Sequence, residues 1–121
     1  MQQTILIVEP SPMISDLLQM QLTLAGYRVF SVATAEDALV ALVCLDVDLV
    51  TLEVRLPDIS GTAFVYLLEQ CRRRTMPIVV LSTTKQEDIG EMEVEGYLRK
   101  PYRLAELMDM VHSLMPVPQL V

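Results

Sequence analysis

The sequence has few of the features that mark metal-binding, redox or membrane proteins. Its two cysteines, Cys44 and Cys71, lack C-x-x-C spacing and both lie in apolar stretches, so we expect buried free thiols rather than a disulfide or a metal pair. The longest apolar run, 38–45, is far shorter than the roughly 20 residues that span a bilayer. No basic-then-apolar segment opens the chain. We therefore expect no membrane association and a cytoplasmic location.

Positive charge is also scarce. The chain has 9 Lys and Arg against 16 Asp and Glu, and its formal net charge is -7. Such a surface repels nucleic acid, so we expect no direct binding to DNA or RNA. The one basic cluster, 72–74, falls at the expected end of a helix, where cations complement the helix dipole.

The composition favours one domain with a well-covered sheet. The chain has 121 residues, 52% of them hydrophobic, which suits a parallel sheet buried on both faces. We predict one domain over residues 1–115. Residues 116–121, which begin Pro-Val-Pro, are predicted to be a C-terminal tail or a truncated linker.

Short apolar runs rich in β-branched residues alternate with helical patterns along the chain. The runs predict strands at 5–8, 28–33, 48–53, 77–82 and 97–99. Helices are predicted from Pro12, capped by Ser11, to Leu24, and then at 35–45, 62–73 and 104–115. This alternation requires right-handed crossovers and helices on both faces of a parallel sheet. It is typical of the flavodoxin-like doubly wound α/β fold, with strand order 2-1-3-4-5.

The segment 83–96 fits this pattern least well. It is acidic and interrupted by glycine, and it has few apolar residues to hold a helix against the sheet. We therefore expect the fourth helix to be shortened or irregular.

The stretch DLVTLEVRLPDISG, residues 48–61, resembles the centre of the receiver domain of bacterial two-component response regulators. The segments ILIVEPSP, PIVVLST and GYLRKP extend the resemblance over nearly the whole chain. The resemblance implies a CheY-like signalling domain of a phosphorelay, with a histidine kinase or an effector domain or protein as partner. It also implies a shortened fourth helix, because the distance from Ser82 to Tyr97 is about one helical turn less than in receivers.

In an open parallel sheet the functional crevice lies beyond the carboxyl ends of the strands. The predicted strands bring Glu9, Glu53, Ser82 and Lys100 to that edge. The resemblance implies that Glu53 stands at the phosphoacceptor position, and that Glu9 and Pro10 stand at the acidic pair. It assigns Ser82 and Lys100 to contacts with the phosphoryl oxygens.

The resemblance gives further positions around this crevice. Tyr97 matches the aromatic switch of the fifth strand, Arg55 flanks the pocket with its carbonyl at a metal-ligand position, and the bond from Lys100 to Pro101 is a candidate cis peptide. In receivers the surface of the fourth helix, fifth strand and last helix binds partners. The resemblance therefore implies a homodimer through 97–99 and 104–115. Met110 lies off the apolar stripe of the last helix, so we expect it to be exposed beside a solvated His112.

The crevice departs from the receiver pattern in its acidic residues. Receivers use aspartates, whereas Glu53 and Glu9 are one methylene longer and Pro10 has no carboxylate. Mg²⁺ demands a near-octahedral set of oxygen ligands. We expect no metal site, or only a weak Mg²⁺ site at Glu9 and Glu53, no other cofactor, and little phosphorylation. Lys100 is expected to pair with the glutamates, with Arg55 as a second counter-charge.

Three functions follow from these residues. The first is a phosphorylation-independent interaction module, which is not an enzyme. The second is a receiver that a histidine kinase still phosphorylates, on Glu53 or another carboxylate. The third is a small flavin-binding or nucleotide-binding protein, which the loop 9–12 disfavours because it has no glycine and its two prolines lack the N–H donors that hold a phosphate.

Overall fold

A five-stranded parallel sheet forms the centre of the computed structural model, which describes residues 2–71 and 74–115. The strands are β1 (Thr4–Val8), β2 (Arg28–Val32), β3 (Leu49–Leu52), β4 (Ile78–Ser82) and β5 (Gly96–Arg99). Their order is β2-β1-β3-β4-β5, and every neighbouring pair is parallel. The predicted flavodoxin-like doubly wound fold is confirmed. The predicted tail 116–121 lies outside the described residues.

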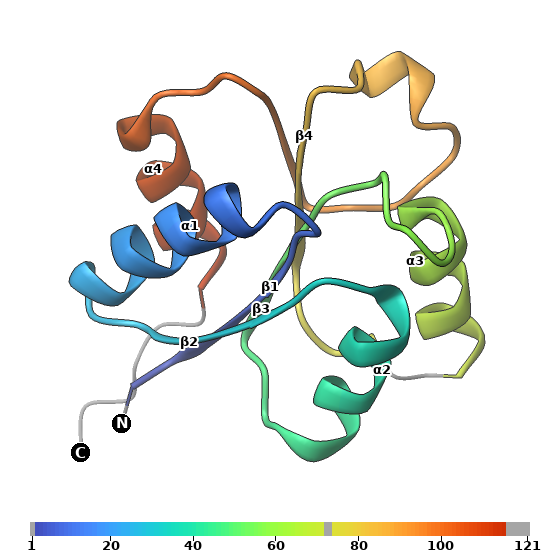
Figure 1. Cartoon of the computed structure of the whole chain (residues 1–121), viewed down its shortest axis with the longest axis horizontal. Helices are drawn as coiled ribbons and strands as arrows, with labels where there is room; N and C mark the ends of the chain where they lie inside the picture. The colour runs from blue at the N-terminus through green and yellow to red at the C-terminus, as the bar shows by residue number, and fades with distance from the viewer. Residues whose placement is uncertain (1, 72–73, 116–121) are drawn as a thin grey trace.

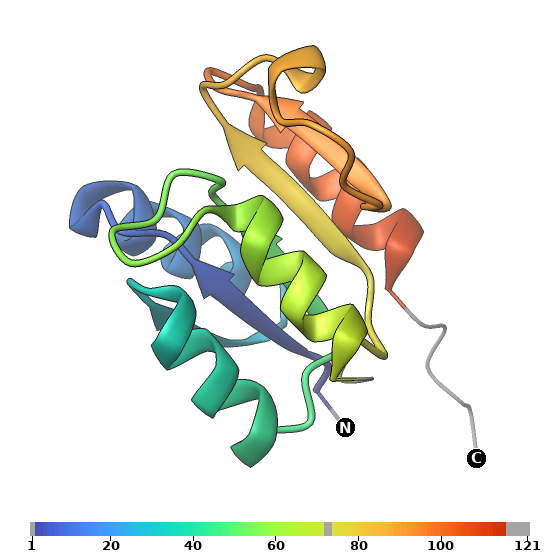
Figure 2. The same ribbon diagram turned by 90° about the vertical axis from the view of Figure 1, so that its right-hand side faces the viewer.

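Helices cover both faces of this sheet. They are α1 (Pro12–Leu24), α2 (Ala35–Cys44), α3 (Gly61–Gln70) and α4 (Leu104–Leu114). On one face, Leu18 of α1 and Leu107 of α4 pack with Ile5 of β1. On the other, Phe64 of α3 packs with Leu6. Figures 1 and 2 show the two helix layers on either side of the strands, which explains why the strands are apolar at successive positions.

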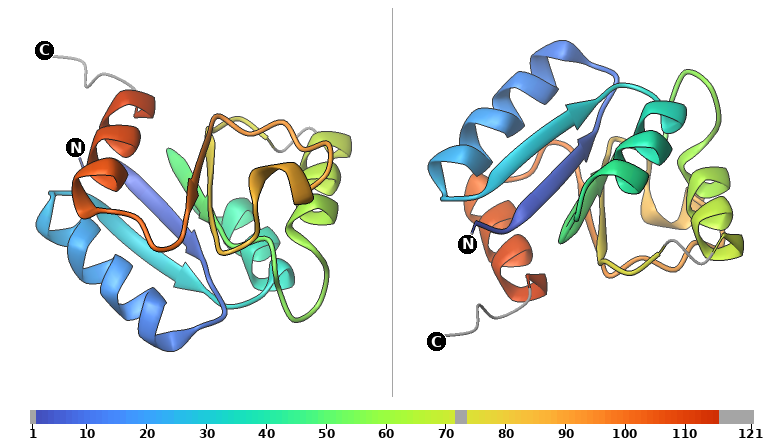
Figure 3. Two further views of the ribbon diagram at one scale, coloured as in Figure 1. Left: turned by 90° about the horizontal axis from the view of Figure 1, so that it is seen from above. Right: turned by 90° about the horizontal axis from the view of Figure 1, so that it is seen from below.

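The connection from β4 to β5 contains no α-helix. Its only helical turn is the 3-10 segment η1 (Gln86–Asp88), so the predicted shortening of the fourth helix is confirmed. Ile89 packs with Val54 and Val80 in a small separate core. The Thr62 hydroxyl donates to the Ile89 carbonyl at 2.9 Å. Figure 3 shows this connection looping out beside α3.

Helix α1 begins as predicted, with the Ser11 hydroxyl accepting the Ile14 N–H at 3.4 Å. One face of α1, formed by Ser15, Leu18 and Leu22, is buried against the sheet. A second apolar face points to solvent and consists of Met13, Leu17, Met20 and Leu24, with exposed fractions of 82%, 49%, 56% and 82%. Since these residues recur at intervals of four and three, they form one continuous stripe.

The prediction that the two cysteines are free thiols is confirmed, but the prediction that they are buried was wrong. Cys44 and Cys71 are free thiols, but both are exposed. Cys44 is the last residue of α2, and Cys71 directly follows α3. The ends of these helices leave their apolar side chains open to solvent.

The prediction for Met110 was also wrong. Its side chain is half-buried against the core, and its sulfur lies directly over Gly96 of β5. His112 is exposed, as predicted, but its Nδ1 lies 2.7 Å from the hydroxyl of Tyr27. Met110 is therefore part of the contact between α4 and the sheet rather than of a free surface.

Two further predictions concern chain geometry. Helix α3 ends at Gln70 rather than Arg73, and residues 72 and 73 lie outside the described part of the chain. Arg74 binds Glu69 at 2.7 Å and also Glu95, so it joins two segments instead of complementing a helix end. The Lys100–Pro101 bond is cis, as predicted.

Among the described residues, no helix has the length and apolar character needed to cross a membrane.

Candidate functional site

The carboxyl ends of four strands bring the predicted polar residues together. Glu9 follows β1, Glu53 follows β3, Ser82 ends β4 and Lys100 follows β5. Backbone bonds align these ends: the Glu53 N–H donates to the Val8 carbonyl at 3.0 Å, and the Lys100 N–H donates to the Ser82 carbonyl at 2.8 Å. We call the resulting set of Glu9, Glu53, Ser82 and Lys100 the crevice.

Glu53 is the best-satisfied member of the crevice. Its carboxylate is buried, with 8% of the residue exposed. Oε2 accepts the Ser82 hydroxyl at 2.5 Å and the Arg55 backbone N–H at 3.2 Å. Oε1 lies 3.2 Å from the Lys100 ammonium. Both oxygens therefore have partners within the fold.

Lys100 joins the two glutamates of the crevice. Its ammonium lies 2.5 Å from Glu9 Oε1, while Glu9 Oε2 accepts the Ser11 N–H at 3.0 Å. The predicted pairing of Lys100 with these carboxylates is confirmed. The two carboxylates share one ammonium within the crevice, and because both are buried, loss of that ammonium would leave uncompensated charge.

Arg55 does not supply the second counter-charge that we expected. Only its backbone N–H contacts Glu53, and its side chain instead lines a neighbouring pocket. The reason is local: Val54 is buried, which turns the next side chain outward from the edge of the sheet.

Ser82 and Tyr97 connect the crevice to the segment after β4. The Ser82 oxygen also accepts the Thr84 N–H at 3.2 Å. The Tyr97 hydroxyl donates to the Thr84 carbonyl, and its ring packs against Val80 and Ile89. The Tyr97 ring thus points inward, and its hydroxyl binds the β4–β5 connection. Tyr97 reaches Glu53 only indirectly, through Thr84 and Ser82.

The residues present do not fit Mg²⁺. Pro10 offers no side-chain ligand, Glu9 is bound to Lys100 and Ser11, and both oxygens of Glu53 have donors. In the described part of the chain, no three His, Cys, Asp or Glu side chains are grouped to hold a metal. A cation here would have to displace Lys100 from both glutamates, and it would find no carboxylate at Pro10.

Two residues with shifted pKa values were missed from the sequence: Tyr102, beside the crevice, and Asp58, outside it. Burial and the charge of Glu9 raise the pKa of Tyr102 to about 12. The N–H groups of Glu36 and Ala35 donate to Asp58 at 2.9 and 3.0 Å, and these bonds lower its pKa. Tyr102 stands two residues after Lys100, which could have drawn attention to it. Nothing local in the sequence joins Asp58 to the start of α2.

Comparison with known proteins fits this arrangement of strands and polar residues. A family model described as the response regulator receiver domain matches residues 5–112. The chain belongs to this family. It is 31% identical over 118 residues to the regulatory protein VanR of Enterococcus faecium, covering 93% of this chain and 50% of VanR. It is 32% identical over 118 residues to the transcriptional regulatory protein GltR of Pseudomonas aeruginosa, covering 93% and 49%.

Solved receiver structures are also similar. The response regulator TrrA of Thermotoga maritima, in complex with Mg²⁺ and BeF, has a TM-score of 0.86 at 26% identity, covering 94% of this chain and 100% of that one. A CheY-like receiver domain from Methylobacillus flagellatus has a TM-score of 0.79 at 28% identity, covering 94% and 99%. The chain is thus a receiver domain of two-component signalling, and it spans about half the length of the curated relatives that it matches.

Proposed function

We propose that this receiver domain acts as a protein-interaction module whose state does not require phosphorylation. The observation that carries the proposal is the Glu53 carboxylate, which binds the Ser82 hydroxyl at 2.5 Å and the Lys100 ammonium at 3.2 Å. These are the two groups that the receiver pattern assigns to phosphoryl oxygens. Glu53 places its own anionic oxygens on them, so one arrangement of the crevice is held without a phosphoryl group.

Charge supports the same proposal. A phosphoryl group on Glu53 would bring further negative charge beside Glu9, where Lys100 is already shared between two carboxylates. Like charges a few ångströms apart in a desolvated site repel strongly. Without a metal to neutralise that charge, the product would be unfavourable. We therefore propose binding without catalysis and without a need for Mg²⁺ or another cofactor.

The exposed stripe of α1 supports the interaction part of the proposal. Four large apolar side chains, Met13, Leu17, Met20 and Leu24, face solvent on one helix whose single charged residue is Asp16. Contiguous exposed apolar surface of this kind marks interaction sites. We propose a signalling protein in the cytoplasm as the partner, either a histidine kinase or an effector domain or protein.

A homodimer through β5 and α4 is the alternative contact. Leu104, at the start of α4, is 49% exposed and would be available for it. Met110 would contribute less than expected, because it already packs over Gly96. The α1 stripe offers more apolar surface, so we favour it as the partner site.

The experiment is treatment of the purified chain with Mg²⁺ and acetyl phosphate, followed by intact mass and amide chemical shifts. We expect both to stay unchanged. A stoichiometric gain of one phosphoryl group would show instead that the domain remains a phosphoacceptor. An absorbance spectrum of the same sample tests the flavin or nucleotide alternative, because either ligand would absorb strongly.

A variant series separates the two departures from the receiver pattern. Glu53→Asp restores the length of the acceptor but leaves Pro10 without a carboxylate, so we expect it to stay inert. Adding Glu9→Asp and Pro10→Asp rebuilds three carboxylates beside Ser82 and Lys100, and this triple variant should bind Mg²⁺ and take up a phosphoryl group. Efficient phosphorylation of Glu53→Asp alone would show that Pro10 is not the obstacle. Circular dichroism serves to verify the fold of each variant.

A further inference from the structure

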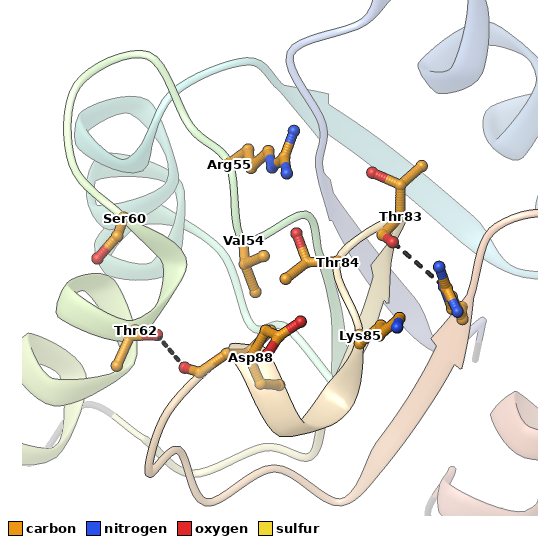
Figure 4. Close-up of a pocket in the computed structure, with 10 residues that line it drawn as sticks. Val54, Arg55, Ser60, Thr62, Thr83, Thr84, Lys85 and Asp88 are labelled. Atoms are coloured by element: carbon orange, nitrogen blue, oxygen red, sulfur yellow. Dashed lines mark hydrogen bonds between the residues drawn. The ribbon is translucent and has the colours of Figure 1, made fainter.

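A second polar site lies beside the crevice, where the fourth helix is missing. It is an open pocket of about 540 Å³ between the start of α3, the β4–β5 connection and the end of β5. Figure 4 shows Arg55 on one side, Lys85 on the other and Thr84 between them. Because η1 is only one short turn, this space is not filled by a helix. We call it the basic pocket.

The charge of the basic pocket is opposite to that of the whole chain. Three of the nine Lys and Arg residues, Arg55, Lys85 and Arg99, line it, against one carboxylate, Asp88. In the described part of the chain, ion pairs within 4 Å involve only Arg74 and Lys100 as cations. Arg99 Nε donates to the Thr83 carbonyl at 3.3 Å. No carboxylate among the described residues therefore pairs with these three cations, and they can bind an anionic ligand.

Thr84 is an independent indication of a ligand. Its Oγ1 is buried and has no hydrogen-bond partner within the described residues. Its N–H and carbonyl are already used, by Ser82 and Tyr97. A buried hydroxyl without a partner is unfavourable, and since Thr84 lines the pocket, rotation of its side chain would let a ligand oxygen satisfy it.

We propose that the basic pocket binds a small phosphorylated metabolite that carries two phosphate groups. Guanidinium groups bind phosphate oxygens through paired, charge-assisted hydrogen bonds. Cations on opposite sides of the pocket favour two anionic groups over one. The pocket volume lies in the range of small-molecule sites, roughly 300–1,000 Å³. The site is separate from the loop that follows β1, and it depends on none of the roles proposed for Glu53.

The test is a titration of the full chain with pyrophosphate in metal-free buffer, followed by calorimetry and by amide chemical shifts. Pyrophosphate carries two phosphate groups and leaves the measurement free of phosphoryl transfer, so the result is independent of whether Glu53 can be phosphorylated. We expect a dissociation constant below about 1 mM, with shifts concentrated at residues 54–62 and 83–88. No binding, or shifts scattered over the surface, would overturn the proposal.

Matched variants distinguish a built site from general attraction to cations. Arg55→Gln and Lys85→Gln should each weaken pyrophosphate binding about tenfold. Arg28→Gln removes the same charge from a guanidinium that lies over the ring of Phe30 on β2, and it should change binding by less than about twofold. Equal weakening by Arg28→Gln and Arg55→Gln would refute a specific site.

Two other probes test the chemistry of the ligand. Inorganic phosphate should bind at least about tenfold more weakly than pyrophosphate, since it cannot reach both sides of the pocket. Citrate carries a similar charge on carboxylates, and it should also bind more weakly. If phosphate matches pyrophosphate, the requirement for two phosphate groups is wrong. If citrate matches it, the ligand class is wrong.

Thr84→Val should reduce binding while leaving the melting temperature unchanged or higher, because it removes the unpartnered hydroxyl.

Discussion

The crevice and the basic pocket lie side by side at one edge of the sheet, yet their charges are organised in opposite ways. In the crevice, the buried carboxylates of Glu9 and Glu53 both bind the partly buried ammonium of Lys100. In the basic pocket, Arg55 and Lys85 are exposed and form no ion pair among the described residues. Buried charges must satisfy one another within the fold, whereas exposed charges can be left for a ligand.

The two sites also differ in the backbone elements that carry them. The crevice residues stand at the ends of β1, β3, β4 and β5, where the sheet holds their backbone. The basic pocket is lined mainly by the connections after β3 and β4. A substitution in the crevice should therefore change the stability of the fold, and one in the pocket should change binding alone.

The largest effect should come from Lys100→Met. It leaves Glu9 and Glu53 buried without a cation, which costs about 3 kcal/mol of unfolding free energy at neutral pH. Lys85→Met makes the same chemical change in the basic pocket and should shift stability by less than about 0.5 kcal/mol. Chemical denaturation of both variants measures the difference. Adding Glu9→Gln to Lys100→Met should recover part of the loss, and equal effects of the two lysine variants would abolish the contrast between the sites.

A smaller effect should appear in alkali at the border of the crevice. Burial and the charge of Glu9 raise the pKa of Tyr102 to about 12, whereas an unfolded tyrosine ionises near 10. The folded state therefore holds the phenol proton of Tyr102 more tightly than the unfolded state. The resulting contribution to stability is fully present below about pH 10 and is lost as the pH rises toward 12. The melting temperature of wild type should therefore fall relative to that of Tyr102→Phe over that interval, because the variant has no group to ionise. Parallel curves would show that Tyr102 does not carry the effect.

The smallest effect should come from a carboxylate outside both sites. The N–H groups of Glu36 and Ala35 lower the pKa of Asp58, so its stabilising contribution is present above the ordinary pKa of 3.8 and disappears as the pH falls through the folded value. Asp58→Asn should lower the melting temperature slightly at pH 7 and not at strongly acidic pH. A constant difference at both pH values would mean that the substitution acts through packing rather than charge.

The crevice could be predicted from the sequence because strand positions alone determine which residues it contains. Each apolar strand ends at a polar residue, and parallel topology brings those ends to one edge, so Glu9 and Glu53 had to lie near Lys100. The length of a segment was equally informative, because the distance from Ser82 to Tyr97 is about one helical turn shorter than in receivers, which implied a shortened fourth helix.

The basic pocket and the exposed stripe could not be predicted in this way. Arg55 and Lys85 lie 30 residues apart on irregular connections, whose course depends on side-chain packing such as that of Ile89. In α1, apolar residues occur on two faces, so spacing alone did not show that Leu18 is buried while Met20 is exposed. The positions of Cys44 and Met110 were misjudged because periodicity does not show where a helix extends past the sheet or what packs over a glycine.

The contacts of the crevice join parts of the chain that are far apart in sequence. Glu9 and Lys100 are 91 residues apart, Glu53 and Lys100 are 47 apart, and Glu53 and Ser82 are 29 apart. Such contacts form only after the loops between them have closed, so we expect them to belong to the late steps of folding. Interactions that are absent from the folding transition state act on the unfolding rate and leave the folding rate almost unchanged. We therefore expect Lys100→Met to raise the unfolding rate and to leave the folding rate almost unchanged, so that the charge network of Lys100 sets the lifetime of the native state.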